Sequence, residues 1–100
     1  MGISISHGAG GSRSGLTISN LGQHLAHTLT ASEWREISDL FDGTFADVAS
    51  IPPHEADRIG ELLHKAAGHR LMPTNWGDLA THIGDSANRA ARAGQNWEWT

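Results

Sequence analysis

Residues 95–100, QNWEWT, determine the architecture that we expect of this chain. Trp97 and Trp99 alternate with polar neighbours, which is the period of a strand with one buried face. Such a strand places both indole rings on one face and Glu98 on the other. Aromatic residues are also frequent in strands. The pattern therefore predicts a C-terminal strand that packs two tryptophans against the rest of the domain.

The N-terminal residues 2–6, GISIS, alternate in the same way. Ile3 and Ile5 point to one face of the expected strand, and serines point to the other. An isolated strand leaves its backbone groups unpaired, so we expect the two terminal strands to pair and to turn their apolar side chains toward the helices. Since a two-stranded ribbon has two open edges, either residues 44–49 add a third strand or a second copy of the chain supplies one.

Between the terminal strands, the spacing of apolar residues predicts four helices. The sequence TASE, residues 30–33, has the form of a capping box, which marks a helix start. The first expected helix spans residues 18–29 and is capped by Thr17 or Ser19. The second follows the N-cap Thr30 and is ended by Gly43. The third begins at Pro53 and is ended by Gly68, and the fourth follows the N-cap Thr74 and is ended by Gly94. The expected fold is α+β, a four-helix core with a small β-ribbon formed by the N- and C-terminal strands, and residues 1–100 form a single compact domain.

The composition limits the classes of function. The chain has 100 residues, a net charge of −4 and no cysteine. Its seven basic residues are scattered, so we expect no nucleic-acid binding, which usually needs a basic face. No stretch has the roughly 20 apolar residues of a membrane span, and no signal peptide is visible at the N-terminus. We expect a cytoplasmic protein that has no membrane partner.

Residues 7–15, HGAGGSRSG, are rich in glycine and stand between an expected strand and a helix. Glycine N–H groups before a helix N-terminus can bind phosphate, but Leu16 and Thr17 replace the Lys and Ser/Thr of a Walker A loop. Arg13 also replaces the third glycine of the dinucleotide fingerprint. We therefore expect a flexible loop, with a small anion- or phosphate-binding domain as the alternative. The residues that would bind such a ligand are His7, Gly8, Gly10, Gly11 and Arg13.

The histidines and hydroxyl groups predict neither a metal site nor a catalytic site. His24 and His27 lie one helical turn apart, but no third ligand is near in sequence, whereas zinc needs three or four. Ser6 and His7 are neighbours on an expected strand, so their side chains should point to opposite faces and form no nucleophile–base pair. We expect no catalytic residue, no cofactor and no enzymatic activity.

The remaining class is a non-enzymatic protein-interaction module, such as an inhibitor, an immunity-type protein or a phage or plasmid accessory protein. Tryptophan is enriched among the residues that dominate binding energy at protein interfaces. The expected interface residues are Trp97, Trp99, Glu98 and Arg13, although core anchoring is the other interpretation of both tryptophans. A second alternative is a structural homo-oligomer, for example a homodimer, joined through strand edges.

Taken in order, several segments give the chain a resemblance to known sequences. They are ISISHG (3–8), NLGQHLAHTLT (20–30), EWREISDLF (33–41), EADRIGELLHKAAGH (55–69), MPTNWGDLA (72–80) and the terminal WEW (97–99). In these segments the chain resembles a family of small actinobacterial proteins that is described as a domain of unknown function. The resemblance covers nearly the full length and implies a fold pattern without a mechanism. Short proteins of this kind are often carried on mobile elements, which favours a regulatory or inhibitory binding role.

Overall fold

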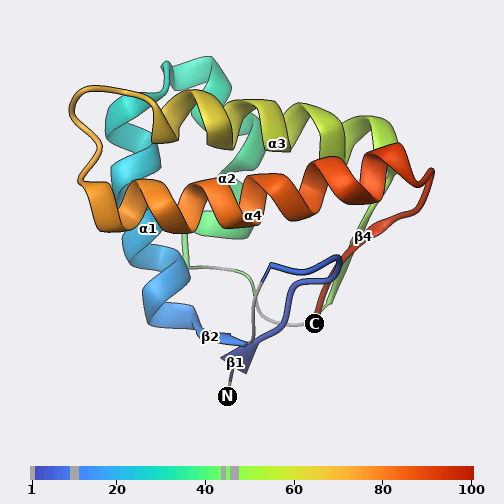
Figure 1. Ribbon diagram of the computed structural model, residues 1–100. Helices are drawn as coiled ribbons and strands as arrows, with labels where there is room; N and C mark the ends of the chain where they lie inside the picture. Colours follow the sequence, from blue (N-terminus) through green and yellow to red (C-terminus); the bar gives the residue numbers. More distant parts are fainter. Residues whose placement is uncertain (1, 10–11, 44, 46–47) are drawn as a thin grey trace.

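The structure is a computed structural model that describes residues 2–9, 12–43, 45 and 48–100 (Figure 1). Within these residues the chain forms four helices and four short strands. In chain order they are β1 (Gly2–Ile3), β2 (Arg13–Ser14), α1 (Gly15–Thr28), α2 (Ala31–Phe41), β3 (Ala49–Ile51), α3 (Pro53–Ala67), α4 (Thr74–Arg92) and β4 (Trp97–Trp99).

The N-terminal segment pairs with the C-terminal strand. The backbone groups of Ser4 and Thr100 form two hydrogen bonds, of 3.1 and 2.8 Å, and the N–H of Ser6 donates to the carbonyl of Glu98 at 2.9 Å. An antiparallel bridge also joins Ile5 to Trp99. The first residues of the segment, which form β1, instead pair with β2 in an antiparallel arrangement. The expected α+β fold, with four helices and a ribbon of terminal strands, is confirmed.

A third strand also reaches the C-terminal strand. β3 lies antiparallel to β4, with Ala49 opposite Trp99 and Ile51 opposite Trp97. We considered residues 44–49 as a possible third strand, and β3 begins at the last residue of that segment. Residues 44, 46 and 47 lie outside the described part of the chain. As a result, β4 has neighbours from the same chain on both sides, and pairing it needs no second copy.

The caps of the first two helices explain where these helices begin. α1 starts at Gly15, three residues before the expected Ile18, because Ser14 caps it by accepting a hydrogen bond of 3.0 Å from the N–H of Thr17. The expected caps, Thr17 and Ser19, are therefore wrong, since both lie inside the helix. The capping box of α2 is confirmed by reciprocal bonds between Thr30 and Glu33.

The two long helices α3 and α4 lie side by side, with α1 and α2 on one side of them (Figure 1). α3 begins at Pro53 as expected, but the expected N-cap Thr74 is instead the first helical residue of α4, after Pro73. Small residues bring the pair together, because a Cβ on Gly60 would lie 3.0 Å from the carbonyl oxygen of Gly84.

The core lies between the helices and β4. Trp97 and Trp99 are both 0 % exposed, and their rings meet edge to face with centroids 5.4 Å apart. Trp99 also meets the ring of Phe41 edge to face at 5.3 Å, while the indole N–H of Trp97 donates to the buried hydroxyl of Ser86 at 3.1 Å. Burial of three large aromatic rings supplies much of the apolar area that stabilises a domain of this size.

Candidate functional site

The Gly-rich segment is partly regular structure. Of the expected loop 7–15, Arg13 and Ser14 form β2 and Gly15 begins α1, so the loop is shorter than expected. His7 and Gly8 have positive φ values of 62° and 83°. The Arg89 guanidinium donates to the carbonyl of His7 at 2.7 Å and to that of Gly8 at 3.1 Å, which fastens this turn to α4. Two further candidate ligand residues, Gly10 and Gly11, lie outside the described residues.

Ser6 and His7 do form a hydrogen-bonded pair, which corrects the expectation that they point to opposite faces. The Ser6 hydroxyl lies 2.7 Å from Nδ1 of His7, because the left-handed backbone at His7 ends the strand and turns the ring back. Nε2 of the same ring lies 2.9 Å from the amide oxygen of Gln95.

A hydroxyl, an imidazole and an amide in series have the connectivity of a nucleophile, its base and an orienting group. In this protein the N–H of Glu98 also donates to the Ser6 hydroxyl oxygen at 2.9 Å. The network therefore joins the N-terminal segment to β4 and to Gln95, the third residue after α4. The members of this network bind one another. Their contacts hold the strained, left-handed turn at His7 in place, which is a structural role.

The residues expected at an interface lie in different environments. The Trp97 and Trp99 rings are buried in the core, which matches the core-anchoring interpretation of both residues. Their strand has neighbours on both sides, and the apolar face of the strand packs against the helices. Glu98 is exposed and accepts a hydrogen bond of 3.0 Å from Ser50, and Arg13 is half-buried in β2.

An apolar pocket of about 310 Å³ lies where the start of α1 meets the end of α2. Beside it stands Leu16, the second residue of α1, whose side chain is 72 % exposed. Sequence reasoning missed Leu16 because it placed this residue before the first helix. The residues that line the pocket are Ile3, Gly15, Leu16, Ile18, Ser19, Leu40, Gly43 and Phe45.

A second hollow, of about 200 Å³, lies along the same junction of α1 and α2, and Ser19 lines both. One helical face of α1 forms its wall, since the contributing residues are three or four positions apart. The hollow depends on how closely α2 approaches α1, so no local sequence signal could have revealed it. The lining residues are Ser19, Gly22, Gln23 and Ala26 from α1, with Trp34 and Phe41 from α2 and Asp42 directly after it.

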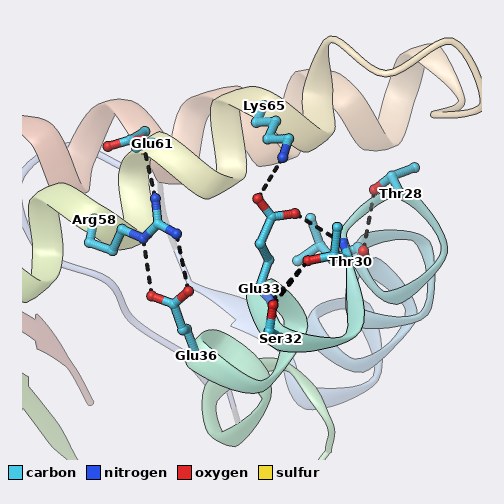
Figure 2. Close-up of polar contacts among 9 residues, drawn as sticks. Thr28, Thr30, Ser32, Glu33, Glu36, Arg58, Glu61 and Lys65 are labelled. Carbon is cyan, nitrogen blue, oxygen red and sulfur yellow. Dashed lines mark hydrogen bonds and ion pairs between the residues drawn. The ribbon is translucent and has the colours of Figure 1, made fainter.

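Ion pairs tie the outer side of α2 to α3 (Figure 2). The hydrogen bond from Lys65, helped by the backbone N–H of Thr30, lowers the pKa of Glu33 to about 2. Arg58 donates two hydrogen bonds to Glu36, of 3.0 and 3.1 Å, and these lower the pKa of the Glu36 carboxyl. Both carboxylates in the first half of α2 are therefore neutralised within the chain.

The histidines are spread over the surface. His24 stacks on Trp76 with ring centroids 5.3 Å apart, and Nε2 of His64 lies 2.8 Å from Asp85. In the described part of the chain, no three histidine or acidic residues gather closely enough to hold a metal ion. Among the same residues, no helix has the length and the apolar character that a membrane crossing needs.

Comparisons with known proteins identify a family. No curated protein and no solved structure matches the chain. One family, described as Domain of unknown function (DUF7739), matches residues 6–100. Since this match covers nearly the whole chain, the protein belongs to that family.

Proposed function

We propose that this protein acts by binding another protein, and that it binds through the two hollows at the junction of α1 and α2, which we call the α1–α2 face. The observation that carries the proposal is the exposed Leu16 beside the apolar pocket. Single exposed apolar side chains are common on soluble proteins. A large apolar side chain next to an apolar pocket is different, because a continuous patch of this kind marks an interaction site.

The proposed role is that of a non-enzymatic, cytoplasmic module, such as an inhibitor, an immunity-type protein or a phage or plasmid accessory protein. We also propose that the protein has an actinobacterial source and is carried on a mobile element, as the resemblance led us to expect. The apolar hollow beside the exposed Leu16 supports this role, because such a surface suits a protein partner.

The experiment compares Leu16→Glu with Leu71→Glu, a matched control whose leucine is 63 % exposed at another place on the surface. Glutamate at the start of α1 is compatible with the helix dipole, so the fold should persist, which circular dichroism checks. Tagged proteins are used to capture partners in the source organism. We expect the wild type and Leu71→Glu to retain one partner that Leu16→Glu loses at least tenfold. Capture that survives Leu16→Glu, or no specific capture by the wild type, contradicts the proposal.

A further inference from the structure

Residues 2–8, which we call the N-terminal strap, run beside β4 and are held to the rest of the fold mainly by exposed contacts (Figure 1). The side chain of Ile3 is buried, and that of Ile5 is half-buried. The hydrogen bonds that join the end of the strap to Gln95 and to Arg89 are exposed. Small buried apolar area and exposed hydrogen bonds are the features of a segment that opens while the rest of a domain stays folded.

The strap also packs incompletely against the helices. Ile3 is one wall of the larger pocket, of about 310 Å³, and the start of α1 and the end of α2 supply other walls. A side chain that borders an open volume has fewer neighbours to attract it than one in a filled core. The pairing of β1 with β2 adds little, because these strands contain two residues each. The apolar anchor of the strap is therefore weaker than the burial of Ile3 alone indicates.

Two features of the closed strap are unfavourable. The backbone of His7 is left-handed, with φ 62°, which is a strained conformation for a residue other than glycine. The indole N–H of Trp99 is buried, and no acceptor for it lies among the described residues. Ile5 stands opposite Trp99 on the neighbouring strand, so the strap covers one side of this residue. Opening would let the backbone at His7 relax and would bring water to the tryptophan.

We infer that the N-terminal strap is a conformational device that opens as a unit while the four helices stay folded. Arg89 is its latch, because the guanidinium donates to the carbonyl of His7 at 2.7 Å and to that of Gly8 at 3.1 Å. Opening removes Ile3 from the wall of the larger pocket and frees one edge of β4. The strap is thus a movable wall of the pocket, whatever the protein binds, and the inference does not rest on the proposed function.

Native-state hydrogen exchange of the ¹⁵N-labelled protein tests the opening. The reporters are the amides of Ser4 and Ser6, which donate to backbone carbonyls at the C-terminal end of the chain. We expect both to exchange at least about tenfold faster than the amides of Ile59 in α3 and Ile83 in α4, whose side chains are buried. Equal protection of the two groups would show that the strap opens only when the whole domain unfolds, which overturns the inference.

Arg89→Gln tests the latch, and Arg92→Gln is its matched control. Both arginines are exposed in the last turn of α4, but Arg92 lines a hollow on the side of α3. Loss of two hydrogen bonds from a charged donor should raise exchange at the strap amides about threefold to thirtyfold, without a change at the α3 and α4 amides. The control should leave both groups unchanged. Equal effects of the two variants, or a uniform rise throughout the protein, contradict the latch.

A disulfide that closes the strap gives a second test. Ser4 and Thr100 are exposed and exchange both of their backbone hydrogen bonds. The Cα atoms of such a pair lie about 5.5 Å apart, which a disulfide can span. In the oxidised Ser4→Cys, Thr100→Cys protein, the Ser6 amide should exchange as slowly as the α3 and α4 amides, and reduction should restore the difference. If the difference persists in the oxidised protein, the Ser6 amide exchanges without opening of the strap, and the inference is wrong.

Discussion

Replacement of Gly22 by alanine should be among the most damaging single changes to this protein. Gly22 lies in the middle of α1, where the end of α2 crosses it. A Cβ added there would lie 1.9 Å from the carbonyl oxygen of Phe41 and 2.8 Å from its carbonyl carbon. Both atoms belong to the backbone, so no side-chain rotation relieves the clash. The oxygen would have to retreat by about 1.1 Å to reach the 3.0 Å limit of real contacts.

Two opposing terms set the size of the effect. Alanine is a better helix former than glycine, which returns about 1 kcal/mol. Overpacking of a core costs about 1–3 kcal/mol and occasionally more. Here the displaced residue is Phe41, which is fully buried against Trp99, so the shift would also disturb aromatic contacts. The cost therefore lies at or above the top of that range, and subtracting the gain in helix propensity leaves a net loss of about 2 kcal/mol or more, which lowers the Tm of a domain of this size by roughly 10 °C or more.

Thermal unfolding followed by circular dichroism measures this loss, and Gly15→Ala is the control. Gly15 is the first residue of the same helix, and a Cβ there would meet no atom within 4 Å. Its substitution should leave Tm unchanged or raise it by a few degrees, through the same helix propensity of about 1 kcal/mol or less. If Gly22→Ala and Gly15→Ala unfold within a few degrees of each other, α2 does not pack on α1 as the structure shows, and the hollows at that crossing are wrong.

Two further predictions concern stability. Because the pKa of Glu33 in the folded protein, about 2, lies below the ordinary glutamate value of 4.5, the unfolded chain binds more protons and stability should fall as pH falls through that interval. Glu33→Gln should flatten this part of the Tm profile, and an unchanged profile would show that Lys65 does not hold the carboxylate in solution. Ser86→Ala should cost about 1–3 kcal/mol, because it leaves the buried indole N–H of Trp97 without its acceptor. Ser50→Ala, at an exposed hydroxyl, should cost about 0.5 kcal/mol or less, and equal losses for the two would refute the buried bond.

Local patterns predicted the frame of the fold well. The alternation at both termini, the capping box at Thr30 and Glu33, and the proline at the start of α3 each act within a few residues, so the sequence displays them directly. The start of α1 was missed because Ser14, Thr17 and Ser19 can all cap a helix, and only the backbone geometry selects Ser14.

Features that depend on backbone conformation or on distant contacts escaped the sequence. The pairing of Ser6 with His7 requires a left-handed residue that is not glycine, which alternation rules exclude. The hollows at the junction of α1 and α2 depend on how closely α2 approaches Gly22, a tertiary distance with no local signal. Leu16 was an apolar residue beside a glycine-rich stretch, and only its position on α1 shows that it is exposed next to a pocket.

The burial of the two tryptophans also changes which surface can bind a partner. β4 is paired on one side with β3 and on the other with the N-terminal segment, so its edges are occupied within the chain. The outer strands β2 and β3 contain two and three residues, and strands this short are a common protection against edge-to-edge association. They offer few backbone hydrogen bonds to a second copy. The α1–α2 face instead combines apolar hollows with an exposed leucine, so a helix surface is a stronger candidate for recognition than a strand edge.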